Sequence, residues 1–561
     1  MLVFPHMPDF SDKFTRRVWL GVGPAAAGLL AANQAQAQPA ADKNLGAKTY
    51  NIRDFGAKGD GATLDTAALQ AAIDACNRDQ GGTVLVPGGV FVIGAVEMKS
   101  NVTLHISAGG TLLGSADGKQ YHAVDAIPLQ GDTTLNDGNW GLIWAVKAQN
   151  FTVEGPGTID GQGAQFRSPS RGVPPPSGIG GAHRPYHLLF YQCQNFSVRD
   201  IFLKDCAFHS VRIVQSSYVK LDGIRIHNRV NHNNDGFHFV SAQHVAISNC
   251  DVQCQDDACA LFGSCQFITV TNCSFSTRWS VFRFGGGTAE NISVSNCLIY
   301  DTFGCPIKIR GGEGPRLENI SFSNIVMKNV TGPISICLGP RNQRPGATPT
   351  ATPETQGIVR NISFRGIRAT VSVPSQFPDV PFTSGYNPGE IKSCIGLSGV
   401  GGFIENISFD DVHVTFPGGG TAEEGALRAV PKVVGEYYAA GVFPAYALYA
   451  RNVRGLTLNN VRFDVAGAEL RPAIVFDHVE DASVNGLTVQ ADPKAESVAR
   501  FIDSRDVLLT ATRVNKSGPV FLRVEGAASE GITIDGGDVS KAAGPVSVGA
   551  GAAKSSVKVR A

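Results

Sequence analysis

Two stretches, NISVSNCLI at residues 291–299 and NISFSNIVM at 319–327, repeat one pattern. Each begins with Asn and then alternates apolar and polar residues, which is the period of a β-strand with one buried face. Similar segments begin at residues 150, 195, 218, 244, 267, 361, 406, 455, 481, 506 and 531. Most of these starts follow one another at a short, nearly constant interval. A few intervals are almost twice as long, and each of these indicates either two turns of the repeat or one turn with a long loop.

A repeat of about 24 residues with strand alternation is typical of a solenoid of stacked coils. The segments lack helical periodicity, and they lack the Leu/Asn consensus of a leucine-rich repeat. The sequence therefore predicts an all-β fold, a right-handed parallel β-helix. Asn-x-Ser/Thr recurs at the start of the repeats, where ladders of Asn at turns are a simpler explanation than glycosylation.

The segment after the first predicted strand is expected to form a short N-terminal capping helix. Its apolar stripe would cover the open end of the solenoid, where a strand edge is otherwise exposed. The stripe consists of Ala67, Leu69, Ala72, Ile73 and Cys76.

Residues 38–561 are predicted to form a single β-helix domain with long insertions near 341–390 and 416–443. Loops of this length often form functional walls. We hypothesise that they close one end of a cleft.

Composition excludes several classes of protein. The chain has 561 residues, of which 43% are hydrophobic and 17% charged, so a large core is possible and a disordered chain is not expected. The 48 basic residues match the 48 acidic ones, which argues against general binding to nucleic acid.

The twelve cysteines do not have the spacing of a metal site. Cys250, Cys273 and Cys297 each follow Asn at the same place in the repeat, which predicts a column of small buried side chains. Some disulfides remain possible.

Residues 1–37 have the pattern of an export signal. Lys13, Arg16 and Arg17 precede an apolar stretch, and Ala35 and Ala37 form an A-x-A cleavage site. The Arg pair favours twin-arginine export, with a general secretion signal as the alternative. We expect a periplasmic or secreted bacterial protein that has no membrane segment after the signal is removed.

Carboxylates recur at the spacing of one coil. Asp235 lies in the motif Asn233-Asn234-Asp235-Gly236, and Asp256 begins the pair Asp256-Asp257 close to one repeat length later. In a solenoid this spacing stacks the side chains on one face of neighbouring coils. Adjacent strand residues point to opposite faces, so both members of the pair can reach one cleft only if the backbone turns or bulges there.

Cations follow on the next coils. Arg278 follows Asp257 at the same interval at which Asp256 follows Asp235. Alternation places Lys308 and Arg310 on the outer face with Ile307 and Ile309 inside. The segment Phe282-Arg283-Phe284 repeats this arrangement.

Three carboxylates within one coil height repel one another, which favours one that stays protonated and two that hold water. This is the chemistry of glycoside hydrolysis. The alternative is a ladder of ion pairs between Asp, Arg and Lys with no catalysis.

These residues resemble glycoside hydrolase family 28, the polygalacturonase family. The resemblance is carried by YNIRDFGAKGDG at 50–61 with Asp65-Thr66, by VLVPGG at 84–89, by GPGTIDG at 155–161, by Arg184-Pro185, and by the N-x-D-G and Q-D-D motifs. It covers most of residues 48–330 and weakens beyond them. It implies an inverting mechanism, with Asp256 as general acid and Asp235 and Asp257 activating water. Asn233, Arg278, Lys308 and Arg310 are then expected to bind substrate.

Two positions depart from the family pattern. Arg278 stands where the family has the His of a Gly-His-Gly motif, and Lys308-Ile309-Arg310 replaces Arg-Ile-Lys. Arg differs from His in proton affinity and from Lys in donor geometry. His238 could partly substitute for the missing His, a structural role being the simpler expectation, and Trp279 could stack on a sugar. The substrate could be polygalacturonate or another pectic or plant polysaccharide or oligosaccharide.

Two other functions remain open. A polysaccharide lyase on the same fold would use Lys308, Arg278 or Arg310 as base, often with Ca²⁺. A non-catalytic carbohydrate-binding β-helix would have lost activity with the His. We expect no organic cofactor, no required metal, and a monomer with a saccharide as its partner.

Overall fold

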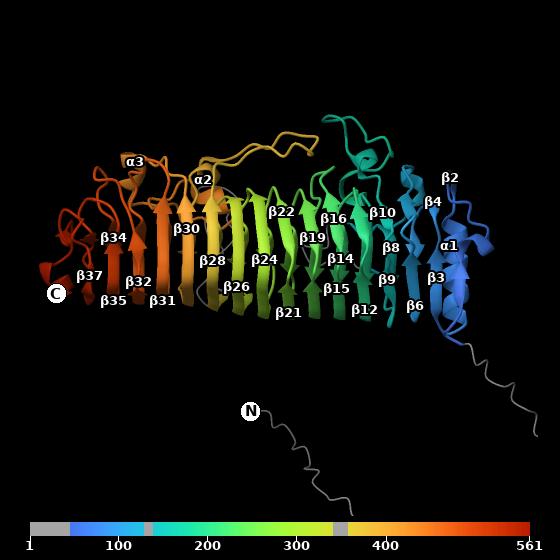
Figure 1. Cartoon of the computed structure of the whole chain (residues 1–561), viewed down its shortest axis with the longest axis horizontal. Helices are drawn as coiled ribbons and strands as arrows, with labels where there is room; N and C mark the ends of the chain where they lie inside the picture. Colours follow the sequence, from blue (N-terminus) through green and yellow to red (C-terminus); the bar gives the residue numbers. More distant parts are fainter. Residues whose placement is uncertain (1–44, 128–137, 313, 340–356, 561) are drawn as a thin grey trace, which may run out of the picture. The chain divides into compact units, whose positions relative to one another are not determined.

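The computed structural model describes residues 45–127, 138–312, 314–339 and 357–560. The predicted export signal and the insertion segment 341–356 lie outside these residues. Within the unit Asn44–Ala561, strands follow one another in a row and pair in parallel with the strand one coil away (Figure 1). The described residues form a right-handed parallel β-helix, which confirms the predicted fold.

Three ladders of parallel strands form the three sides of the coils. The first ladder contains the repeat segments from which the fold was predicted. Its strands are β1 (Thr49–Asn51), β3 (Gly82–Val86), β6 (Val102–Ile106), β9 (Thr152–Glu154), β12 (Gln194–Arg199), β15 (Ser217–Asp222), β18 (Gln243–Ser248), β21 (Cys265–Thr271), β24 (Ala289–Thr302), β26 (Arg316–Val330), β28 (Ile358–Val371), β30 (Ile404–Phe416), β31 (Leu448–Val465), β32 (Ile474–Asn485), β35 (Arg505–Val514), β37 (Ile532–Asp538) and β39 (Val557–Arg560).

The second ladder includes the later halves of six long strands that begin in the first ladder, namely β24, β26, β28, β30, β31 and β35. Its separate strands are β2 (Asp60–Leu64), β4 (Gly89–Ile93), β7 (Gly110–Gly114), β10 (Thr158–Asp160), β13 (Phe202–Lys204), β16 (Arg225–Asn228), β19 (Asp251–Cys254), β22 (Ser274–Thr277) and β33 (Thr488–Val489).

The third ladder includes the first residues of β31 and β32. Its separate strands are β5 (Val96–Glu97), β8 (Gly141–Val146), β11 (Tyr186–Tyr191), β14 (Val211–Val214), β17 (Phe237–Val240), β20 (Cys259–Phe262), β23 (Phe282–Phe284), β25 (Ile307–Gly311), β27 (Ile334–Leu338), β29 (Ile395–Gly399), β34 (Ala499–Ile502), β36 (Leu522–Glu525) and β38 (Val546–Val548).

One apolar core runs through the coils because alternate strand residues point inward. Equivalent side chains stack on one another from coil to coil. The rings of Phe322 and Phe364 lie 5.3 Å apart, and those of Phe364 and Phe409 lie 5.0 Å apart, nearly parallel in both pairs. All twelve cysteines are free and buried, so Cys250, Cys273 and Cys297 act as the small apolar side chains that the repeat predicts.

The repeated Asn explains a bend near the start of the long strands of the first ladder, where it lies within the strand but outside the pairing register. Asn319, Asn361 and Asn406 all have φ between 53° and 56°, in the left-handed region that Asn tolerates better than most residues. Their side-chain amides hydrogen-bond from coil to coil, with Nδ2 to Oδ1 distances of 3.2 and 3.1 Å. The predicted Asn ladder is therefore present. Where Asn is replaced, as at Tyr218 and His244, the rings stack instead.

Replacing Asn361 by Ala should lower the free energy of unfolding by about 1–2 kcal/mol, because Ala keeps the left-handed strain and loses both ladder hydrogen bonds. Asn361→Gly is the matched control, since Gly also loses the hydrogen bonds but adopts positive φ without strain. We expect Gly to be about 1 kcal/mol less destabilising than Ala in urea unfolding. Equal losses for the two variants would show that backbone strain has no part in this turn.

The predicted capping helix is present as α1 (Thr66–Arg78), at the N-terminal end of the row of coils (Figure 1). Leu69, Ala72, Ile73 and Cys76 are buried against the first coils as predicted. Ala67 is exposed, and Ala75 takes its place in the stripe. The inclusion of Ala67 was wrong because the helical period of about 3.6 residues per turn places it on the face opposite Leu69, Ile73 and Cys76.

Two insertions follow strands of the coil and contain the short helices α2 (Pro388–Ile391) and α3 (Ala422–Gly425). In Figure 1 the loop before α2 lies along the same edge of the coils as the segment around residues 167–184. Residues of the two segments line one cavity, Arg167 and Arg171 from the first and Pro381 and Phe382 from the second. No helix within the described residues is long and apolar enough to cross a membrane.

Candidate active site

The candidate site lies at the corner where the second ladder turns into the third. The chain leaves β19 at Cys254, bends at Gln255 and Asp256, and enters β20 at Cys259. This bend breaks the strand alternation, so Asp256 and Asp257 both line one cavity of about 490 Å³. The sequence-based expectation of a turn or bulge at this pair is confirmed.

Acidic, basic and aromatic side chains surround the cavity. Besides the two aspartates, Glu436 contributes a carboxylate, while Arg283 and Lys308 contribute cations. The remaining lining residues are His232, Asn233, Gln255, Phe262 and Trp279. A polar cavity with opposed charges and aromatic faces can bind a saccharide through hydrogen bonds and ring stacking.

Asp256 is the candidate acid. Desolvation, together with the neighbouring charge of Asp257, raises the pKa of Asp256 to about 7. Its Oδ1 accepts the backbone N–H of Asp257 at 2.9 Å, and the Nδ2 of Asn233 lies 3.5 Å from its Oδ2. A carboxyl group that keeps its proton near neutral pH can serve as a general acid.

Asp257 is supported differently. Its Oδ1 accepts the backbone N–H of Ser280 at 3.2 Å, and the Nε of Arg283 lies 3.9 Å from its Oδ2. A backbone donor and a cation both stabilise a charged carboxylate. The two adjacent aspartates therefore have different electrostatic surroundings.

Lys308 and Glu436 form a close ion pair across the cavity. The Nζ of Lys308 lies 2.5 Å from Oε2 of Glu436, and an Nη of Arg283 lies 3.7 Å from Oε1. Lys308, with Arg283 and Arg310, holds the pKa of Glu436 well below its ordinary value, so this side chain is ionised. The 416–443 insertion thereby adds a negative charge to the site.

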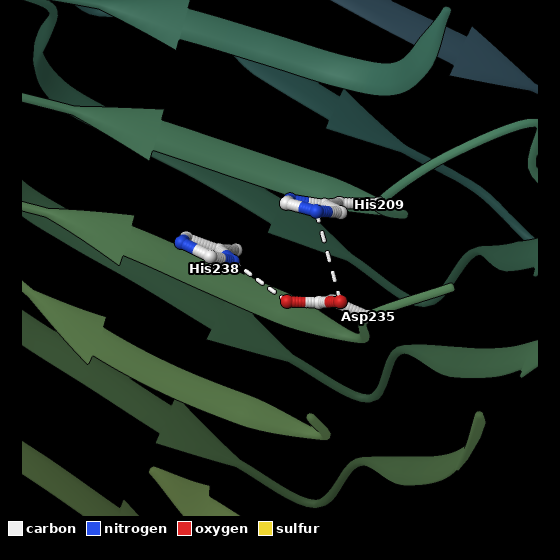
Figure 2. A group of neighbouring side chains, drawn as sticks. All are labelled: His209, Asp235 and His238. Atoms are coloured by element: carbon white, nitrogen blue, oxygen red, sulfur yellow. Dashed lines mark hydrogen bonds and ion pairs between the residues drawn. The ribbon is translucent and has the colours of Figure 1, made fainter. Parts of the chain in front are cut away.

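Asp235 occupies the preceding coil and is 5% exposed. Figure 2 shows its carboxylate beside the imidazoles of His209 and His238, with one oxygen toward each. Nδ1 of His238 lies 2.7 Å from Oδ2, and Nε2 of His209 lies 3.6 Å from Oδ1. Burial and the charge of Arg212 lower the pKa of both histidines well below the ordinary value, so both rings are neutral at pH 7. His238 is therefore a buried partner of Asp235.

His209, Asp235 and His238 also form a group whose possible ligand atoms lie within 4.8 Å of one another. The arrangement fits a hydrogen-bonded set better than a metal site. His238 and Asp235 already bond directly, and an Nη of Arg212 lies 3.3 Å from Nδ1 of His209. A guanidinium at this distance would repel a bound cation.

Only some of the other predicted site residues line the cavity. Asn233 and Lys308 line it, whereas Asp235 and Arg278 are not among its lining residues. Arg310 lines a neighbouring cavity with Gly286 and Gly287, although it is close enough to contribute to the lowered pKa of Glu436.

Arg278 is buried beneath the 373–390 insertion. Its Nη1 lies 3.1 Å from Oε1 of Glu390, and its Nη2 donates to the carbonyl of Gly385 at 2.8 Å. The guanidinium stacks over Trp279 and Tyr386, with 4.5 and 4.3 Å from Cζ to the ring centroids. In this position Arg278 holds the insertion against the cavity wall.

Three contributors were not predicted as site residues. Glu436 lies in an insertion without repeat periodicity, so no spacing rule places it near Lys308. Arg283 was predicted to point outward but was not assigned to the site. Its position one coil before Lys308, in register with it, was the signal that could have placed it there. His209 precedes β14 as Asp235 precedes β17, and the register Val211 to Phe237 places the two on adjacent coils.

Comparison with known proteins identifies related sequences and folds. The model of glycosyl hydrolases family 28 matches residues 76–382. The chain is 24% identical to a polygalacturonase from Gossypium barbadense over 408 residues, covering 69% of this chain and 88% of that protein. It is also similar in fold to two solved structures. The first is an exopolygalacturonase from Thermotoga maritima, with a TM-score of 0.56 and 19% sequence identity, covering 74% of this chain and 92% of that chain. The second is a family 28 exopolygalacturonase from Yersinia enterocolitica, with a TM-score of 0.56 and 18% sequence identity, covering 79% of this chain and 78% of that chain.

Proposed function

The chain belongs to glycosyl hydrolases family 28, and from this premise we propose that it hydrolyses glycosidic bonds in a pectic or related uronate-containing saccharide with inversion of configuration. The observation that carries the proposal is the pair of adjacent aspartates at the bend, of which Asp256 retains its proton near neutral pH. Polygalacturonate-like substrates are the first class to test.

The proposed reaction is a single displacement. Asp256 donates its proton to the glycosidic oxygen as the bond from that oxygen to the anomeric carbon breaks. Water attacks the opposite face of this carbon and gives its proton to a carboxylate, a role assigned to Asp257 and Asp235. Asp257 lines the cavity, while His238 and His209 orient Asp235 from the preceding coil.

Substrate binding is assigned to Asn233, Arg278, Lys308 and Arg310. Asn233 lies next to Asp256, and Lys308 faces the same cavity. We propose that Arg278 acts on substrate through Trp279, whose ring it covers, and that Arg310 acts from the neighbouring cavity. Export through the signal at residues 1–37 is part of the same proposal.

The pH dependence of kcat/KM should reflect Asp256 in the free enzyme. Because the acid must be protonated, activity should fall as the pH rises through about 7, by about tenfold per unit above it. The measurement is kcat/KM for a saturable oligosaccharide between pH 5 and 9. A plateau that extends to pH 9 would exclude Asp256 as the acid.

Defined pectic oligosaccharides with NMR detection of the first anomer formed test the reaction itself. Inversion gives the anomer opposite to that of the substrate, and no absorbance of a new C=C bond develops in the near ultraviolet. A retained configuration or an unsaturated product would overturn the proposal. Lys308 is held in an ion pair with Glu436, which argues against the lyase alternative because a base would have to leave that pair.

A further inference from the structure

Glu436 is held in the cavity by the residues on both sides of it in the chain. Val434 is buried with Cys337 and Val400, and Tyr437 is buried beneath the third ladder. The hydroxyl of Tyr437 accepts the backbone N–H of Cys394 at 2.7 Å and donates to its carbonyl at 2.8 Å. A carboxylate anchored on both sides is a fixed part of the binding surface.

Glu436 forms ion pairs with the two cationic side chains that would otherwise attract an acidic sugar. Lys308 contacts one carboxylate oxygen at 2.5 Å, and Arg283 lies near the other at 3.7 Å. Among the lining residues, Glu436 and Asp257 face the positive charges of Lys308 and Arg283, and Arg310 adds a further positive charge from the neighbouring cavity. A uronate carboxylate that approaches Lys308 would meet the carboxylate of Glu436 directly and would have to displace it from the ion pair.

Resting on the proposed function, we infer that Glu436 is a specificity-determining residue that makes the Lys308 side of the site select an uncharged sugar unit, either a neutral sugar or an esterified uronate. Hydroxyl groups can share the Lys308–Glu436 pair, since Glu436 accepts hydrogen bonds and keeps 31% of its side chain exposed.

A free uronate can be accommodated in the next cavity. That cavity shares His232 with the first, and Arg167, Arg171 and Arg184 lie in its lining without any Asp or Glu among the lining residues. Arg184 also donates to Oδ1 of Asn233 at 3.1 Å, which links the two cavities. The asymmetry of charge fits a saccharide with an uncharged unit on the Lys308 side and an acidic unit on the other.

The test compares galacturonate oligosaccharides of one length as free acids and as full methyl esters, because esterification removes the charge of each unit and leaves the sugar and the linkage unchanged. Binding is measured by calorimetry in Asp256→Asn, so that turnover does not interfere. We expect Asp256→Asn/Glu436→Gln to shift the ratio of methyl-ester affinity to free-acid affinity at least tenfold toward the free acid, relative to Asp256→Asn. The change in the ratio is the readout, because the basic neighbouring cavity favours the free acid in both variants. The matched control is Asp256→Asn/Glu424→Gln, since Glu424 belongs to the same insertion and pairs with Lys392 instead.

The outcomes separate this inference from the proposed function. A shift of the ratio by less than tenfold in Asp256→Asn/Glu436→Gln overturns it, and Asp256→Asn/Glu436→Ala replaces this variant if it does not fold. A ratio that Glu436→Gln leaves unchanged, or that Glu424→Gln shifts equally, also overturns it, as does failure of both oligosaccharides to bind. Hydrolysis by the unmodified enzyme tests the proposed function independently, since binding selectivity does not require turnover.

Discussion

Asp256→Asn should lower kcat by about 10²- to 10⁴-fold while the protein still folds. The amide has nearly the same shape and can still accept the backbone N–H of Asp257, but it has no proton to donate to the glycosidic oxygen. The loss corresponds to about 3–5 kcal/mol of transition-state stabilisation. The measurement is kcat on the best oligosaccharide, with circular dichroism and thermal unfolding to establish that the fold is retained.

A matched control and a second substrate identify the role of Asp256. Asp251→Asn changes a carboxylate on the same coil that bonds Ser274 and lies outside the cavity, so kcat should change less than twofold. An aryl glycoside whose leaving group needs little protonation should reduce the loss in Asp256→Asn. Unchanged turnover, or an equal loss for both kinds of leaving group, would contradict a general acid at this position.

The fold was predictable because each coil repeats the same local constraints. Asn319, Asn361 and Asn406 mark the left-handed turns, and the alternating residues after them face one shared core. The capping helix was predictable from its apolar stripe, although Ala75 belongs to the buried face and Ala67 lies on the opposite one.

The site was predictable only where it belongs to the coils. The spacing of Asp235 and Asp256 placed them on neighbouring coils, and the bend at Asp256 followed from the need to turn two adjacent carboxylates to one side. Glu436 was not predictable, since its partner Lys308 is 128 residues away and the insertion follows no period. Glu390, the partner of Arg278, was not predictable for the same reason.

Arg278→Ala should lower the free energy of unfolding of the insertion region by about 3–5 kcal/mol. The substitution leaves the carboxylate of Glu390 in a position that is 0% exposed in the intact protein, without its guanidinium partner, and it removes the stacking on Tyr386. Asn387 still donates to Glu390, which keeps the loss within this range. The measurement is urea unfolding, together with hydrogen exchange of residues 373–391.

Arg365→Ala is the control for this prediction, because the side chain of Arg365 is 76% exposed and its ion pair with Asp410 should contribute less than about 1 kcal/mol. Arg278→Ala/Glu390→Gln should recover part of the loss, since much of it comes from the carboxylate left buried. If Arg278→Ala is no more destabilising than Arg365→Ala, the insertion does not depend on this pair. The result therefore decides whether Arg278 has a structural role in holding the insertion.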